Sequence, residues 1–171
     1  MQLEINEKII LREWRNSDEK RIVALANNEK IARNMRDVFP HPYFEKNARQ
    51  WIKQCQEEKK NLLLAIEYEG ELVGGIGAHF QEDIYRYSAE LGYWIGEAYW
   101  GKGIVTKAIG VFSDYLFSHY KINRLFGEVF SSNPASGMVL LKNGFKNEAI
   151  LEKAAFKNGF FIDILIYSKL K

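Results

Sequence analysis

Cysteine, proline and histidine are scarce in this chain of 171 residues, which holds one Cys, three Pro and three His. The single cysteine, Cys55, excludes a disulfide within the chain and a CxxC metal knuckle. Few prolines and no polar tract leave little room for a linker, so we expect one domain over residues 1–171. His79 and His119 have no companion at metal-ligand spacing, which predicts no metal site.

Long apolar runs and an excess of one charge are also missing. The longest runs, such as 62–66 and 72–78, are far shorter than the roughly 20 residues of a membrane-spanning helix. The chain starts without the basic-then-apolar order of a signal peptide, so we expect a cytoplasmic protein without membrane contact. Lys and Arg total 24 against 22 Asp and Glu, a net charge of +2 that gives no reason to expect nucleic-acid binding.

Apolar residues make up 47% of the chain and follow strand and helix periodicities in turn. The pattern predicts an α+β (mixed α/β) fold, with a largely antiparallel sheet of about seven strands and about four helices. The expected strands are 9–14, 61–68, 72–80, 88–95, 124–130, 149–156 and 160–169. The expected helices follow 16–18, contain 48–55, begin near 101–103 and begin near 132–134.

Two local patterns refine this outline. Residues 39–43, Phe-Pro-His-Pro-Tyr, must be irregular because the two prolines remove backbone donors and disfavour helix in the residues before them. Cys55 lies at helical spacing from Ala48, Trp51 and Ile52, so it belongs to a core-facing helix side and is not expected to react.

A glycine turn between a strand and a helix, at Gly101 and Gly103, is the strongest indication of chemistry. Unpaired N–H groups at a helix N-terminus bind anions such as a diphosphate, although a lone Gly-x-Gly also fits a plain tight turn. Residues 96–103 match seven of the eight positions of a nucleotide-binding P-loop. Gly103 stands where that loop needs a magnesium-binding hydroxyl, so we set nucleotide hydrolysis aside.

Four motifs occur together in order along the chain. They are Phe39-Pro40-His41-Pro42-Tyr43, Ala89-Glu90-Leu91-Gly92-Tyr93-Trp94-Ile95, Trp100-Gly101-Lys102-Gly103-Ile104-Val105, and Asn133-x-x-Ser136 leading to Leu140-Leu141-Lys142-Asn143-Gly144-Phe145. With these motifs the chain resembles the GNAT superfamily of acyl-CoA-dependent N-acyltransferases, and within it the ribosomal-protein N-terminal acetyltransferases. It departs from the superfamily signature at Trp100, which replaces Arg or Gln, and at Val105, which replaces a small residue.

The resemblance implies a sheet that splays between its fourth and fifth strands, where the pantetheine arm of acetyl-CoA lies. Backbone N–H groups would hold the diphosphate, strand residues would pair with the pantetheine amides, and Lys102 would either add a charge or remain a surface lysine. The residues implied in cofactor binding are Trp94, Ile95, Gly101, Lys102, Gly103, Ile104, Val105, Thr106, Asn133 and Ser136. An amide near Ile95 would also face the thioester oxygen.

Glu90 is the candidate catalytic base, and binding of the cationic acceptor is its alternative role. Strand alternation puts Glu90 on the same sheet face as Gly92 and Trp94. Many members of the superfamily carry a tyrosine acid at the position of Leu140, which has no hydroxyl. We therefore name Ser136 as the candidate acid, with helix packing or a cofactor contact as alternatives, and hold Tyr93 in reserve.

The resemblance to the ribosomal-protein branch implies that the acceptor is the N-terminal α-amine of a protein, and such an amine is also easier to deprotonate than a lysine-like one. Phe39, His41 and Tyr43 would line one wall of the acceptor cleft, together with Glu90. Two other functions stay open: acetylation of a small amine such as a polyamine or an aminoglycoside, and acyl-CoA binding without catalysis. An edge strand or the C-terminal hairpin would also allow a homodimer.

Overall fold

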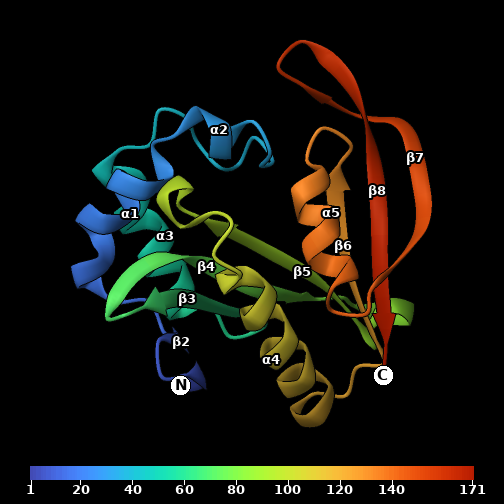
Figure 1. The fold of residues 1–171 in the computed structure, drawn as a ribbon, viewed down its shortest axis with the longest axis horizontal. Coiled ribbons are helices and arrows are strands. Elements are labelled where there is room, and N and C mark those ends of the chain that lie inside the picture. Colours follow the sequence, from blue (N-terminus) through green and yellow to red (C-terminus); the bar gives the residue numbers. More distant parts are fainter.

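The computed structural model describes residues 1–171, which form one eight-stranded sheet with five α-helices around it (Figure 1). The strands are β1 (Gln2–Asn6), β2 (Ile9–Arg12), β3 (Leu62–Tyr68), β4 (Glu71–Phe80), β5 (Ser88–Ile95), β6 (Arg124–Phe130), β7 (Lys146–Lys157) and β8 (Phe160–Leu170). The helices are α1 (Glu19–Ala26), α2 (Glu29–Ala32), α3 (Glu45–Glu57), α4 (Ile104–His119) and α5 (Pro134–Leu141).

The strands lie in the order β1-β2-β3-β4-β5-β6-β8-β7. Only β5 and β6 are parallel neighbours; every other neighbouring pair is antiparallel. The predicted mixed α/β class with a largely antiparallel sheet is therefore confirmed. The hairpin predicted at Asn158-Gly159 joins β7 to β8, and both residues have the positive φ that its turn requires, +51° and +87°.

Helices cover the two faces of the sheet unequally, and each face has its own core. Strand alternation sends Leu64 and Ile66 of β3 into a main core with α4, whereas Ala65 between them joins a smaller core with α1 and α3. Figure 1 shows α4 and α5 on one side, with α1 to α3 grouped over the β2–β4 end. No helix overlies β6, β7 and β8 on the side away from α5.

β5 and β6 separate soon after they begin. Their ladder consists of three pairs, in which Ser88, Ala89 and Glu90 face Arg124, Leu125 and Phe126. Beyond that point β5 remains paired with β4 and β6 with β8, so the two strands diverge (Figure 1). This is the splay that the resemblance implies, and it leaves an opening between the two halves of the sheet.

Two elements escape the sequence patterns. β1 raises the strand number from the seven expected to eight, and α2 raises the helix number from four to five. Residues 2–6 alternate over only five positions, and α2 is a single turn of four residues, too short for a helical period to show. None of the helices combines the length and apolar character that a membrane crossing needs.

Candidate active site

The glycine turn lies immediately before α4, at one end of the opening. Gly101 and Gly103 have φ of +73° and +72°, and a Cβ placed on either would meet no atom within 4 Å. Gly103 is the N-cap of α4 and offers no side-chain acceptor to the first N–H groups of the helix. These groups are therefore free to bind an anion in the open space above the turn, which fits a diphosphate.

The residues after the turn present their backbone and bury their side chains. Ile104 and Val105 are 2% and 8% exposed and belong to the main core, so Val105 leaves the approach to the turn open. Lys102 is exposed, and its Nζ lies 5.0 Å from the centre of the Tyr99 ring. The Trp100 indole N–H donates to the Ile95 carbonyl at 2.9 Å, so the residue that departs from the family signature closes the loop between β5 and α4.

The backbone of β5 supplies the other wall of the opening. The Gly96 N–H donates to the Val73 carbonyl at 2.8 Å, which fixes the alternation of backbone groups along β5. By this alternation the N–H of Trp94 faces β4, whereas the N–H groups of Ile95 and Tyr93 face the opening. Of the two residues implied for pantetheine pairing, Ile95 is oriented for it and Trp94 is not.

Two hydroxyl groups meet on the α5 side of the opening. The Tyr93 and Ser136 hydroxyl oxygens are 2.7 Å apart, and the Tyr93 hydroxyl is 3.1 Å from the Ser136 carbonyl oxygen. Burial raises the pKa of Tyr93 to about 12. Asn133 is the N-cap of α5, and its side chain accepts from the Ser136 N–H at 3.4 Å. Leu140 is fully buried against Gly127, so it packs between α5 and β6.

A bridged pair of carboxylates lies on the opposite side of the same opening. Nη2 of Arg36, in the segment between α2 and α3, is 2.5 Å from Glu90 Oε1 on β5 and 2.9 Å from Glu128 Oε2 on β6. Burial raises the pKa of Glu90 above its usual range, the Arg36 charge lowers it, and the Glu128 charge raises it. Glu90 is thus a partly buried carboxylate whose protonation the neighbouring charges control.

The Phe-Pro-His-Pro-Tyr segment is irregular, as predicted, but its aromatic residues differ in role. Phe39 packs edge-on against Trp94, with ring centroids 5.8 Å apart. Tyr43 is 5% exposed and belongs to the smaller core, and burial raises its pKa to about 12. It is therefore a packing residue, in contrast to the expectation that it lines a cleft. His41 is exposed.

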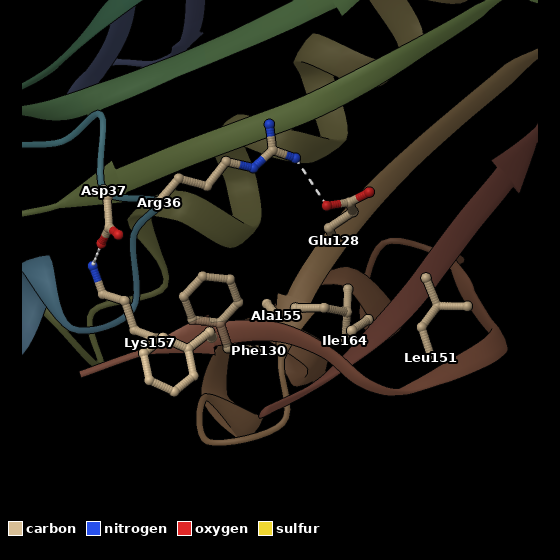
Figure 2. Close-up of a pocket in the computed structure, with 10 residues that line it drawn as sticks. Arg36, Asp37, Glu128, Phe130, Leu151, Ala155, Lys157 and Ile164 are labelled. Atoms are coloured by element: carbon tan, nitrogen blue, oxygen red, sulfur yellow. Dashed lines mark hydrogen bonds and ion pairs between the residues drawn. The ribbon is translucent and has the colours of Figure 1, made fainter. Parts of the chain in front are cut away.

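A cavity of about 370 Å³ opens beside Arg36 and Glu128 (Figure 2). Its wall is largely apolar and comes from β6 and the β7–β8 hairpin, including Phe130, Leu151, Ala155 and Ile164. Asp37 Oδ1 and Lys157 Nζ, 2.7 Å apart, tie the segment after α2 to this hairpin. The side chain of Arg36 reaches from that segment toward Glu128 across the top of the cavity in Figure 2.

The sequence profile of the acetyltransferase (GNAT) domain matches residues 8–146. The chain belongs to this family. It is 30% identical to the uncharacterized N-acetyltransferase YoaA of Bacillus subtilis over 96% of this chain and 94% of the relative. It is 31% identical to the ribosomal-protein-serine acetyltransferase of Escherichia coli over 63% of this chain and 60% of that one.

Two solved structures extend the comparison to the GNAT fold. Microcin C7 self immunity acetyltransferase MccE, in complex with acetyl-CoA and AMP, is 28% identical and superposes with a TM-score of 0.84 over 99% of this chain and 96% of that one. The ribosomal L7/L12 α-N-protein acetyltransferase RimL, in complex with coenzyme A, shares the fold alone, at 20% identity and a TM-score of 0.88 over 99% and 98%.

The protein is therefore an acetyl-CoA-dependent N-acetyltransferase with a GNAT fold. No group of three or more His, Cys, Asp or Glu residues is arranged to hold a metal ion. Arg36 and Glu128 are the charged residues at the opening that sequence reasoning missed. They lie 54 and 38 positions from Glu90 along the chain, and the parallel register of β5 and β6 that unites Glu90 and Glu128 is not encoded in any local pattern.

Proposed function

We propose that this N-acetyltransferase acetylates the N-terminal α-amine of a protein, with Glu90 as the base that takes the proton from the attacking amine. The observation that carries this proposal is the arrangement of Glu90 on one side of the β5–β6 opening and of the Tyr93 and Ser136 hydroxyls on the other. Acetyl-CoA supplies the acetyl group as a thioester when it is bound. The residues of the chain bind acetyl-CoA, orient the amine and accept its proton.

In this proposal the glycine turn holds the diphosphate through the N–H groups of Gly101, Lys102, Gly103, Ile104, Val105 and Thr106. The N–H of Ile95 faces the opening, where it would stabilise negative charge on the carbonyl oxygen of the acyl group. Asn133 would contact the pantetheine arm while it caps α5. Trp94 contributes through its packing against Phe39, because its backbone is directed to β4.

The Tyr93–Ser136 pair would assist the departing thiolate by hydrogen bonding. A hydroxyl whose pKa is about 12 does not give up its proton to a thiolate whose conjugate acid has a reference pKa near 8.5. A hydrogen bond from Ser136, itself in contact with Tyr93, lowers the energy of the developing negative charge without such a transfer. This replaces the acid that Leu140 cannot provide.

Ser136→Ala is expected to lower kcat about tenfold, since one hydrogen bond to a charged group is worth about 1.5 kcal/mol. Acetyl-CoA affinity should change little, because the backbone hydrogen bond from the Ser136 N–H to the Asn133 side chain remains. Single-turnover kinetics measure the effect, and Ser132→Ala, an exposed serine two positions before α5, is the matched control. Equal rates for Ser136→Ala and wild type would show that Ser136 only packs α5.

The energetics of deprotonation favour an α-amine as acceptor. An α-amine with a reference pKa near 8 needs about 1 kcal/mol to be neutral at pH 7, and a lysine-like amine near 10.4 needs roughly 4–5 kcal/mol. One partly buried carboxylate is a modest base, which suits the first class. The cavity beside Arg36 offers apolar space for the side chain of the acceptor's first residue. Its wall includes Phe156, which is exposed and could contact the residues that follow in a polypeptide acceptor.

The relatives support both this acceptor and a rival. The Escherichia coli relative is named for acetylating a ribosomal-protein serine, and the MccE structure contains AMP, a small molecule. Acetylation of a small amine is therefore the second candidate function. A ribosomal-protein acceptor further implies activity in the cytoplasm, where such proteins are made.

Mass spectrometry of a mixed acceptor panel tests the proposal. The panel contains protein N-terminal peptides with blocked lysines, spermidine and aminoglycosides, incubated with acetyl-CoA and the enzyme. We expect a gain of about 42 Da on the peptide α-amine, because its lower pKa matches the available base. A gain on a small amine alone would confirm acetyltransferase activity but show that the acceptor is a small amine and not a protein N-terminus. Heat-inactivated enzyme serves as the control for spontaneous acetylation.

A further inference from the structure

Arg36 occupies an unusual position for a surface arginine. A single nitrogen, Nη2, contacts carboxylates on both diverging strands, Glu90 on β5 and Glu128 on β6. Glu90 belongs to the last pair of the β5–β6 ladder, and Glu128 lies two residues beyond the last paired residue of β6. The guanidinium therefore sits where the two strands begin to separate.

An N-acetyltransferase must admit an amine at this same opening. An amine that is to lose its proton directly to Glu90 has to come within hydrogen-bond reach of the Glu90 carboxylate. At Oε1 that place is held by Arg36 Nη2, a positively charged nitrogen 2.5 Å away. Arg36 and a protonated acceptor cannot both occupy it, because like charges at contact distance repel.

We propose that the Arg36 guanidinium stands in for the ammonium group of the acceptor, and that Arg36 sets the selectivity of the enzyme for cationic amines by competing with them for Glu90 and Glu128. An amine enters by exchanging with the guanidinium, one positive charge for another, so the net charge of the site is the same before and after entry. This proposal rests on the proposed role of Glu90 at the acceptor site.

The surroundings of Arg36 permit this exchange. Its side chain is 56% exposed, against 20% for Glu90, so the guanidinium can move into solvent while the carboxylate stays in place. The neighbouring Asp37 is tied to Lys157 of the β7–β8 hairpin at 2.7 Å. Rotation of the Arg36 side chain therefore suffices, and the segment that carries it can remain where it is.

Glu128 has a second effect once the acceptor has replaced Arg36. Proton transfer from the ammonium to Glu90 turns a pair of like-charged carboxylates into one neutral and one charged group, which relieves their repulsion. The N–H bond of the ammonium breaks, an O–H bond forms on Glu90, and the net charge of the site is unchanged. Glu128 thus attracts the cation, and its charge raises the pKa of Glu90, the group that takes the proton.

Removal of Arg36 shows whether this residue competes with the acceptor for the carboxylates or positions Glu90 for catalysis. Arg36→Ala is expected to lower the KM of the accepted amine about fivefold, because the amine no longer has to displace an exposed ion pair. The kcat should stay within twofold of wild type. Propylguanidinium, which reproduces the arginine side chain, should bind Arg36→Ala and compete with the acceptor. It should have no effect on wild type or on Arg33→Ala, a control that removes an arginine from the same region.

Isothermal titration of propylguanidinium into Arg36→Ala needs no turnover, so its result stands even if the acceptor panel yields no product. Saturable binding that disappears in the double variant Arg36→Ala, Glu128→Gln supports the proposal. Absence of binding to Arg36→Ala overturns it. A lower kcat at constant KM, restored by propylguanidinium, also overturns it, because Arg36 would then position Glu90 for catalysis.

Discussion

Glu90→Gln is expected to slow acetyl transfer by about 10²–10⁴-fold and to leave the affinity for acetyl-CoA unchanged. The amide keeps the size and polar character of the side chain and cannot accept the proton. Arg36 retains Glu128 as its partner, so the local structure is preserved. Steady-state kinetics with the accepted amine, together with acetyl-CoA titration, measure the two quantities separately.

Glu4→Gln provides the matched control, since it makes the same chemical change on β1, far from the opening in the strand order. A kcat equal to wild type in Glu90→Gln would remove Glu90 from proton transfer. A higher acceptor KM with unchanged kcat would assign it to acceptor binding, the alternative role that its place beside Arg36 also suits.

The pH profile gives an independent signature of the same base. Burial and the Glu128 charge raise the pKa of Glu90, and the charges of Arg36 and His79 lower it, with a net rise. The carboxylate form is needed for catalysis, so kcat/KM should fall as the pH falls through this raised pKa. That acid limb should be absent in Glu90→Gln, whereas the limb from the acceptor amine, near pH 8, should remain.

Gly103→Val is expected to weaken acetyl-CoA binding by at least about tenfold, because a branched side chain would fill the open space above the first turn of α4. The backbone there has a φ of +72°, which costs a residue with a Cβ roughly 1–2 kcal/mol. The variant should therefore also melt at a lower temperature. Calorimetric titration with acetyl-CoA measures the loss of affinity.

Gly159→Val separates ligand contact from backbone strain. Gly159 has a φ of +87°, and a Cβ added to it would meet no atom within 4 Å, as at Gly103, but it lies in the β7–β8 turn. Both variants should lose similar stability, and only Gly103→Val should lose affinity. Wild-type affinity in Gly103→Val would show that the diphosphate binds elsewhere.

Local patterns were enough for the parts of the fold that depend on neighbouring residues. The helical face of Ala48, Ile52 and Cys55, the Asn158-Gly159 hairpin and the glycine turn before α4 follow from spacing and backbone preference alone. Cys55 is half-buried, and burial raises the pKa of its thiol to about 12, in keeping with the unreactive role expected of it. β1 and α2 are too short to carry such a signal.

The charged environment of Glu90 could not be obtained in this way. Arg36 follows α2 in an irregular segment without periodicity, and nothing near it in the sequence indicates a partner on β5 or β6. The orientation of Trp94 also depends on a long-range fact, the hydrogen bond between Gly96 and Val73 that fixes which β5 amides face β4. Side-chain alternation alone put Glu90 on the correct face but said nothing about the opposing strand.

The ladder between β5 and β6 has only three pairs, so the backbone groups that face the gap beyond it have no strand as a partner. The two parts of the sheet, β1–β5 and β6–β8, are joined at one end by this short ladder and share the main core. A ligand bound in extended conformation would complete the sheet across the gap between β5 and β6 and form hydrogen bonds with the backbone of both strands. The co-substrate would then act as a structural strand of the enzyme for as long as it is bound, and its release would remove these hydrogen bonds from the gap.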